Sequence, residues 1–181
     1  DETELRVLKR DGKATNSMSR MWVFCSGKYS SKPMSLYKYH PTRSAKVVES
    51  VLGDYKGYLQ TDGCKSYTHA WEAKRIGCWA HARRKWIDCL PKGIKADGSK
   101  AVQALSIVEE IFTVEKGFDG METESIYTER IAKIKPLLSK YWELLEKIDA
   151  PKGSALDKAV NYSMNNKKEL EGFLADGRLE L

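Results

Sequence analysis

The chain has 181 residues, of which 41% are hydrophobic, 10% aromatic and 31% charged. This composition is typical of a globular protein and excludes a disordered or collagen-like chain. No apolar run approaches the roughly 20 residues that a membrane-spanning helix needs, and the amino-terminal residues lack the apolar stretch of a signal peptide. We therefore expect a soluble cytoplasmic protein with no membrane partner.

Positive charge is concentrated in the first part of the sequence. The net charge is +6, but residues 1–100 hold 20 Lys and Arg against 10 Asp and Glu, whereas residues 101–181 hold 11 against 15. A basic surface attracts phosphates because their binding releases counterions. This asymmetry favours a polyanionic partner such as nucleic acid; the alternative is a surface that only keeps the protein soluble.

The first part of the chain is predicted to be rich in strands. Alternating or continuous apolar residues around Leu5–Val7, Arg20–Cys25 and Met34–Tyr39 predict a meander of three antiparallel strands. Ser44 is a suitable N-cap for a short helix whose valines and leucine share one face and end at Leu52. This helix is expected to pack on one face of the sheet.

Two further strands are predicted over Gly57–Asp62 and Arg75–Ala80, joined through a helical turn around Tyr67–Ala73. Together with the meander and the short helix, they predict an α/β fold: one mixed sheet of three antiparallel strands and then two further strands, with helices on its faces.

From about residue 98 the hydrophobic period becomes helical. Two helices are expected to pair as a hairpin around Gly117–Gly120, and Pro136 should kink the second one or mark its first turn. A third helix is predicted from Ser154 to Asp176–Gly177. The apolar stripes of these helices are interpreted as core.

Two aspartates have the positions that a metal site needs. Asp1 opens the first strand region and Asp62 ends the fourth strand, so neighbouring strands can bring both carboxylates into one site. Such a pair suits Mg²⁺ or Mn²⁺, and two ions about 4 Å apart would support phosphoryl transfer. The alternative is that Asp62 only fills an Asp-Gly turn and Asp1 is solvated.

The densest feature of the chain is the basic and aromatic run from Cys78 to Trp86. It includes the candidate DNA-binding residues His81, Arg83, Arg84 and Lys85 at the junction of a strand and a helix. The arginines can grip phosphates while Trp79 and Trp86 stack on bases. The alternative is that both tryptophans are core and the basic residues form a solvated face.

The four cysteines lie far apart with no CxxC pair, so we expect reduced thiols. Cys64, His69, Cys78 and His81 can be gathered as four zinc ligands, but their order has no known zinc-knuckle spacing.

Four segments resemble the central domain of bacterial transposases of the insertion sequence 66 family. They are Asp1-Glu-Thr, Gly57–Gly63, the Cys-Trp-Ala-His-Ala-Arg-Arg-Lys string from Cys78 to Lys85, and Phe173–Glu180. The resemblance implies an RNase H-like fold, like that of the retroviral integrases, and a triad of two Asp and one Glu that binds two divalent metal ions. It assigns Asp1 and Asp62 as the first and second acids.

The third acid of that family has no counterpart here. The family's Glu follows the Leu-Glu segment, whereas this chain stops at Leu181, and neither Asp176 nor Glu180 is at the family position. We therefore expect a fragment of a longer transposase, without the third acid or an amino-terminal DNA-binding region. Its predicted parts are an RNase H-like core over 1–97, a helical insertion over 98–150, and a segment over 151–181 that leads to the missing acid.

The resemblance implies an enzyme that cuts DNA at transposon ends and joins a 3′-hydroxyl to target DNA, working as a homo-oligomer in the bacterial cytoplasm near the nucleoid. One alternative is a nuclease or resolvase of the same fold, in which the acids direct water. Another is a non-catalytic nucleic-acid-binding module.

Overall fold

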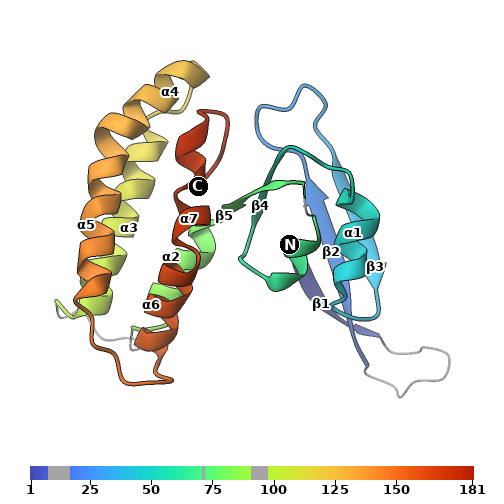
Figure 1. The fold of residues 1–181 in the computed structure, drawn as a ribbon, viewed down its shortest axis with the longest axis horizontal. Helices are drawn as coiled ribbons and strands as arrows, with labels where there is room; N and C mark the ends of the chain where they lie inside the picture. Colours follow the sequence, from blue (N-terminus) through green and yellow to red (C-terminus); the bar gives the residue numbers. More distant parts are fainter. Residues whose placement is uncertain (8–16, 71, 91–97) are drawn as a thin grey trace. The chain divides into compact units, whose positions relative to one another are not determined.

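The computed structural model describes residues 1–7, 17–70, 72–90 and 98–181 (Figure 1). The chain divides into two units, residues 1–75 and residues 76–181. The first unit contains a β-sheet covered by a helix, and the second is built from helices. The domain boundaries at residues 97 and 150 stay a prediction.

The predicted meander is confirmed in the first unit. Strands β1 (Glu2–Val7), β2 (Ser17–Cys25) and β3 (Ser35–His40) form an antiparallel sheet in the order β1-β2-β3. Helix α1 (Ala45–Leu52) follows, and the hydroxyl of Ser44 accepts a hydrogen bond from the backbone N–H of Lys46 at 3.3 Å, as the predicted cap requires. Val47 and Val48 of α1 are buried against Trp22 of β2.

The two later strands form a separate sheet, which corrects the expectation of one mixed sheet. Strand β4 (Tyr58–Thr61) leads through the 3₁₀-helix η1 (Lys65–His69) to β5 (Lys74–Gly77), and β4 pairs with β5 in parallel. Among the described strands, β1 is hydrogen-bonded to β2 alone. The backbone amino and carbonyl groups of Asp1 are also hydrogen-bonded to Val23 of β2, so the pairing of β1 with β2 extends to Asp1.

The fifth strand ends three residues earlier than predicted, because Trp79 and Ala80 begin a helix. Helix α2 (Trp79–Ile87) buries Trp79, Ala82 and Trp86, which share one helical face. The indole N–H of Trp79 donates to the carbonyl of Leu170 at 2.8 Å. Burial of the tryptophan in the second unit therefore outweighs its preference for a strand.

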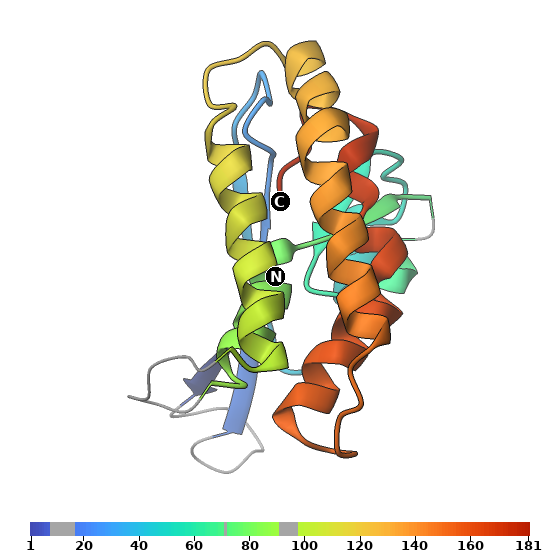
Figure 2. The same cartoon turned by 90° about the vertical axis from the view of Figure 1, so that its left-hand side faces the viewer.

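The predicted helical hairpin is formed by α3 (Lys100–Lys116) and a longer segment antiparallel to it (Figure 2). That segment consists of α4 (Thr123–Glu129), the π-helix η2 (Arg130–Ile134) and α5 (Lys135–Glu146). Pro136 lies in the first turn of α5, one of the two positions expected for it. The π-helical turn η2 directly precedes α5. No described helix combines the length and the apolar character that crossing a bilayer requires.

The third predicted helix begins as expected but is not continuous. Helix α6 (Ala155–Asn165) starts after Ser154, whose hydroxyl accepts from the N–H of Asp157 at 3.0 Å. Asn166 ends it by donating its side-chain amide to the carbonyl of Tyr162 at 2.7 Å. The chain then continues as α7 (Lys167–Leu170) and the 3₁₀-helix η3 (Gly172–Ala175), so the prediction of one helix to Asp176 is wrong.

A buried polar chain crosses the core of the second unit. The indole N–H of Trp86 donates to the hydroxyl of Tyr141 at 2.7 Å, and that hydroxyl lies 2.7 Å from the hydroxyl of Ser163. Burial raises the pKa of Tyr141 to about 12, although its bonds with Ser163 and Trp86 act in the opposite direction. The hydroxyl therefore stays protonated and joins α2, α5 and α6.

We expect Tyr141→Phe to lower the free energy of unfolding by about 1 to 3 kcal/mol, because it leaves the Trp86 N–H buried without its acceptor. Urea unfolding measures this loss. Tyr127→Phe is the matched control, since Tyr127 is 39% exposed. Equal stabilities of the two variants would contradict a stabilising role for the polar chain.

Candidate active site

Asp1 is held at the start of β1 by its backbone. Its amino group donates to the carbonyl of Val23 at 3.0 Å, and the N–H of Val23 donates to the carbonyl of Asp1 at 2.8 Å. One carboxylate oxygen accepts from the N–H of Glu2 at 3.0 Å. The side chain is exposed, so this carboxylate is fixed at its base and open to solvent.

Asp62 directly follows β4 and is fixed by a turn. Its Oδ1 accepts from the N–H of Cys64 at 2.8 Å, and Gly63 between them has a φ of +84°, which favours glycine. Asp62 therefore does fill the Asp-Gly turn, as the alternative interpretation held. Only Oδ1 is used for this hydrogen bond, however, and the second oxygen points toward Arg43.

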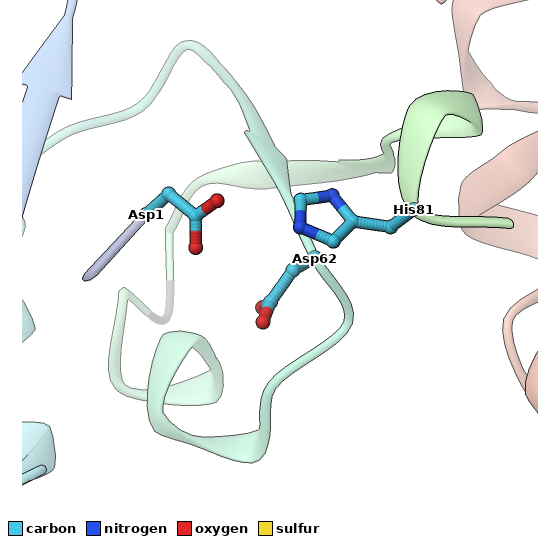
Figure 3. Close-up of side chains that lie close together, drawn as sticks. All are labelled: Asp1, Asp62 and His81. Carbon is cyan, nitrogen blue, oxygen red and sulfur yellow. The ribbon is translucent and has the colours of Figure 1, made fainter. Parts of the chain in front are cut away.

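The two carboxylates lie close together (Figure 3). Ligand oxygens of Asp1 and Asp62 are within 4.8 Å of each other. Carboxylates at this separation repel each other unless positive charge is nearby, and their hard oxygens match the ligand preference of Mg²⁺ and Mn²⁺. The pair thus fits a divalent cation chemically, and its role as a metal site stays a prediction.

Three residues that sequence reasoning missed surround this pair. Glu2 is paired in register with Trp22, so its side chain lies on the face of the sheet that contacts Tyr67. Its carboxylate, only 2% exposed, accepts from the Tyr67 hydroxyl at 3.3 Å and is ion-paired with Arg43. The same Arg43 guanidinium lies 3.5 Å from Oδ2 of Asp62.

The charges of this cluster keep Tyr67 protonated and Arg43 positively charged. Burial, followed by the negative charges of Glu2 and Asp62, raises the pKa of Tyr67, so its hydroxyl remains a donor. Burial alone would lower the pKa of Arg43, but the carboxylates of Glu2 and Asp62 and the nearby Cys64 raise it. Arg43 therefore remains a cation beside two carboxylates.

The candidate DNA-binding residues lie on α2 in the second unit. His81 is in its first turn and half-buried (Figure 3), and Arg84 and Lys85 are exposed in its last turn. Arg83 is partly engaged, because its guanidinium donates to Glu109 of α3 at 2.6 Å. Of the predicted residues, Arg84 and Lys85 thus present their charge most openly.

The tryptophans of this run belong to the core. Trp79 and Trp86 are both 0% exposed, so the interpretation that they stack on bases is wrong. Cys78 precedes α2 as its N-cap. Burial would raise the pKa of its thiol, but the nearby His81 and the backbone N–H groups at the start of α2 outweigh burial and lower it. Of the four possible zinc ligands, Cys64 lies in the first unit, Cys78 and His81 lie in the second, and the side chain of His69 is outside the described residues.

A family model described as "Transposase IS66 family" matches residues 1–181. The chain belongs to this family. Similar curated proteins from Sinorhizobium fredii are uncharacterized protein y4qI, which is 28% identical over 196 residues, and uncharacterized protein y4jD, which is 29% identical over 197 residues. All of this chain is covered, but it spans only 36% and 38% of those proteins. No solved structure matches it.

Membership in the IS66 family confirms the resemblance carried by the four segments and indicates a transposase-related function. It leaves the third acid open. Asp176 pairs with Arg178 at 2.6 Å, and the hydrogen bonds of Arg178 lower the pKa of Asp176 to about 2. A cation would therefore compete with Arg178 for this carboxylate in this IS66-family chain.

Proposed function

We propose that this chain is part of the catalytic domain of a DNA transposase that cleaves DNA at transposon ends and joins a 3′-hydroxyl to target DNA. The observation that carries the proposal is the pair of carboxylates, Asp1 and Asp62, within 4.8 Å of each other in a chain of the IS66 family. Both carboxylates belong to the first unit. The RNase H-like fold is part of the same proposal.

Asp1 and Asp62 would hold the divalent ions, Mg²⁺ or Mn²⁺. Two such ions, when bound, activate the attacking oxygen and stabilise the leaving oxygen of a phosphodiester. The chain's own contribution is orientation: the N–H of Glu2 directs the Asp1 carboxylate and the N–H of Cys64 directs that of Asp62. Carboxylates fixed in this way lose little conformational entropy when they bind a cation.

DNA is the proposed partner, and the exposed basic end of α2 is the proposed contact with its backbone. Arg84 and Lys85 are exposed there, and the basic residues of the chain are concentrated in residues 1–100. A long flexible cation on a helix surface binds phosphate without reading bases. We expect a homo-oligomer to assemble on the DNA, in the bacterial cytoplasm.

Arg84→Ala is expected to weaken binding of the chain to duplexes of unrelated sequence alike and to lower the slope of log affinity against log salt by about 1. Fluorescence anisotropy from low to moderate salt measures both. Lys140→Ala on α5 is the matched control, since Lys140 is also exposed in the second unit. An unchanged slope with a lowered melting temperature would show that Arg84 stabilises the fold and that DNA binds elsewhere.

The experiment that tests the proposed function is a strand-cleavage and strand-transfer assay on the full-length polypeptide, with transposon-end DNA and Mg²⁺. We expect cleaved ends and products joined to target DNA. Cleavage without joining would favour the nuclease or resolvase alternative. Binding without cleavage would favour the non-catalytic module and overturn the proposal.

A further inference from the structure

The carboxylate of Glu2 is buried, and a buried charge without a counter-ion is unfavourable. Its side chain is 2% exposed, and its carboxylate contacts the hydroxyl of Tyr67 at 3.3 Å and the Nε of Arg43. An ionised carboxylate is stable at such a depth only when a cation balances it. Glu2 therefore fixes the position of the Arg43 guanidinium.

Arg43 interacts with Asp62 as well as with Glu2. It directly precedes Ser44, the cap of α1, and its terminal nitrogen lies 3.5 Å from Oδ2 of Asp62. The other oxygen of Asp62 accepts from the N–H of Cys64. One guanidinium is thus shared between a buried carboxylate that anchors it and a carboxylate of the candidate metal site.

We propose that Arg43 is a built-in counter-ion and positioning residue of the Asp1–Asp62 pair, held in place by Glu2. Without a metal ion, its positive charge offsets the repulsion between the two carboxylates and orients Asp62. A divalent cation that binds the pair must compete with this guanidinium for Asp62. This inference rests on the proposed metal site, and it assigns Arg43 and Glu2 a role in setting the affinity of that site.

A second ion pair on the same sheet provides a matched comparison. Arg20 pairs with Glu4 at 2.6 Å, and these two residues face each other across β1 and β2, as Glu2 and Trp22 do two pairs away in the register. Arg20→Gln and Glu4→Gln change the net charge of the same unit by the same amounts as the corresponding changes at Arg43 and Glu2. They therefore separate a local effect on Asp62 from the general effect of charge on a cation.

The test is the affinity of the 181-residue chain for Mn²⁺, measured by calorimetry. We expect Arg43→Gln to bind Mn²⁺ about 3- to 10-fold more tightly, because a positive charge next to Asp62 is lost. Glutamine still offers a donor to Asp62, and Cys64 still holds the other oxygen. Arg43→Lys keeps the charge and should stay within about 2-fold of the unaltered chain, as should Arg20→Gln and Glu4→Gln.

Glu2→Gln is expected to act in the opposite direction. It releases Arg43 from its anchor, so the guanidinium binds Asp62 more strongly and Mn²⁺ binds about 3-fold more weakly. The double variant Glu2→Gln/Arg43→Gln should resemble Arg43→Gln, because without Arg43 the anchor has nothing to hold. Two independent charge effects would instead cancel and return the double variant to the affinity of the unaltered chain.

The outcomes separate this inference from the proposed function. If the unaltered chain binds no Mn²⁺ but Arg43→Gln does, the inference holds and metal binding by the unaltered chain is disproved. If neither binds, if Arg43→Gln binds no more tightly, or if Arg20→Gln tightens binding equally, the inference is overturned. Should Arg43→Gln fail to fold because Glu2 loses its counter-ion, Glu2→Gln and the double variant make the same comparison without a buried unpaired charge.

Discussion

Asp62→Ala in the full-length polypeptide is expected to reduce DNA cleavage and joining by about 10³-fold or more. It removes a proposed ligand of the divalent ions, whose positive charge would stabilise the transition state at the reacting phosphate. The fold should survive, since the side chain is 18% exposed and lies in a turn rather than in the core. Single-turnover assays with transposon-end DNA measure the loss, and circular dichroism checks the fold.

Two further variants sharpen this test. Asp62→Asn keeps an oxygen for the N–H of Cys64 but removes the negative charge, so it should be as inactive as Asp62→Ala while preserving the turn. Asp54→Ala is the control, because Asp54 is exposed in the same unit. Near-normal turnover of either Asp62 variant would remove Asp62 from the active site.

Arg130→Met is expected to have the largest effect on stability, lowering the free energy of unfolding by about 3 to 5 kcal/mol. The Arg130 side chain is 2% exposed and is ion-paired with Glu115 of α3. It also donates to three backbone carbonyls of the last segment, those of Phe173 at 3.1 Å, Asp176 at 3.0 Å and Leu179 at 2.7 Å. Its loss would leave these acceptors and a carboxylate without their shared donor.

Urea unfolding of the 181-residue chain measures this effect. Arg178→Met is the matched control: Arg178 is 64% exposed and pairs with Asp176 at the surface, so its replacement should cost less than about 1 kcal/mol. A loss at Arg130 no greater than at Arg178 would show that the buried arginine does not hold the last segment to α3 and η2.

Much of the local structure could be predicted because the deciding residues are neighbours in the sequence. Ser44 and Ser154 begin helices with hydrogen bonds to amides two or three residues later. Pro136 marks a first turn because proline lacks an amide proton. The end of β5 was not predicted, because Trp79 is drawn into a helix by burial and by a bond to the distant Leu170.

The candidate site likewise contains residues that the sequence predicts and residues that it does not. Asp1 directly precedes β1 and Asp62 directly follows β4, and these positions can be predicted from hydrophobic periodicity and an Asp-Gly turn. Glu2 and Arg43 carry no such signal, because their importance depends on the register of β1 with β2 and on the packing of Tyr67. The core role of the α2 tryptophans likewise depends on distant partners, which composition does not reveal.

The most direct measurement of the central claim is a Mn²⁺ titration of the 181-residue chain followed by paramagnetic broadening of backbone amide signals. We expect weak binding, with a dissociation constant on the order of 1 mM, since two carboxylates leave a hard cation largely hydrated. Signals at the start of β1 and at Asp62–Cys64 should broaden first, and Asp62→Asn should abolish this pattern. Broadening that begins elsewhere and is unchanged in Asp62→Asn would contradict the assignment of Asp1 and Asp62 as the metal-binding pair.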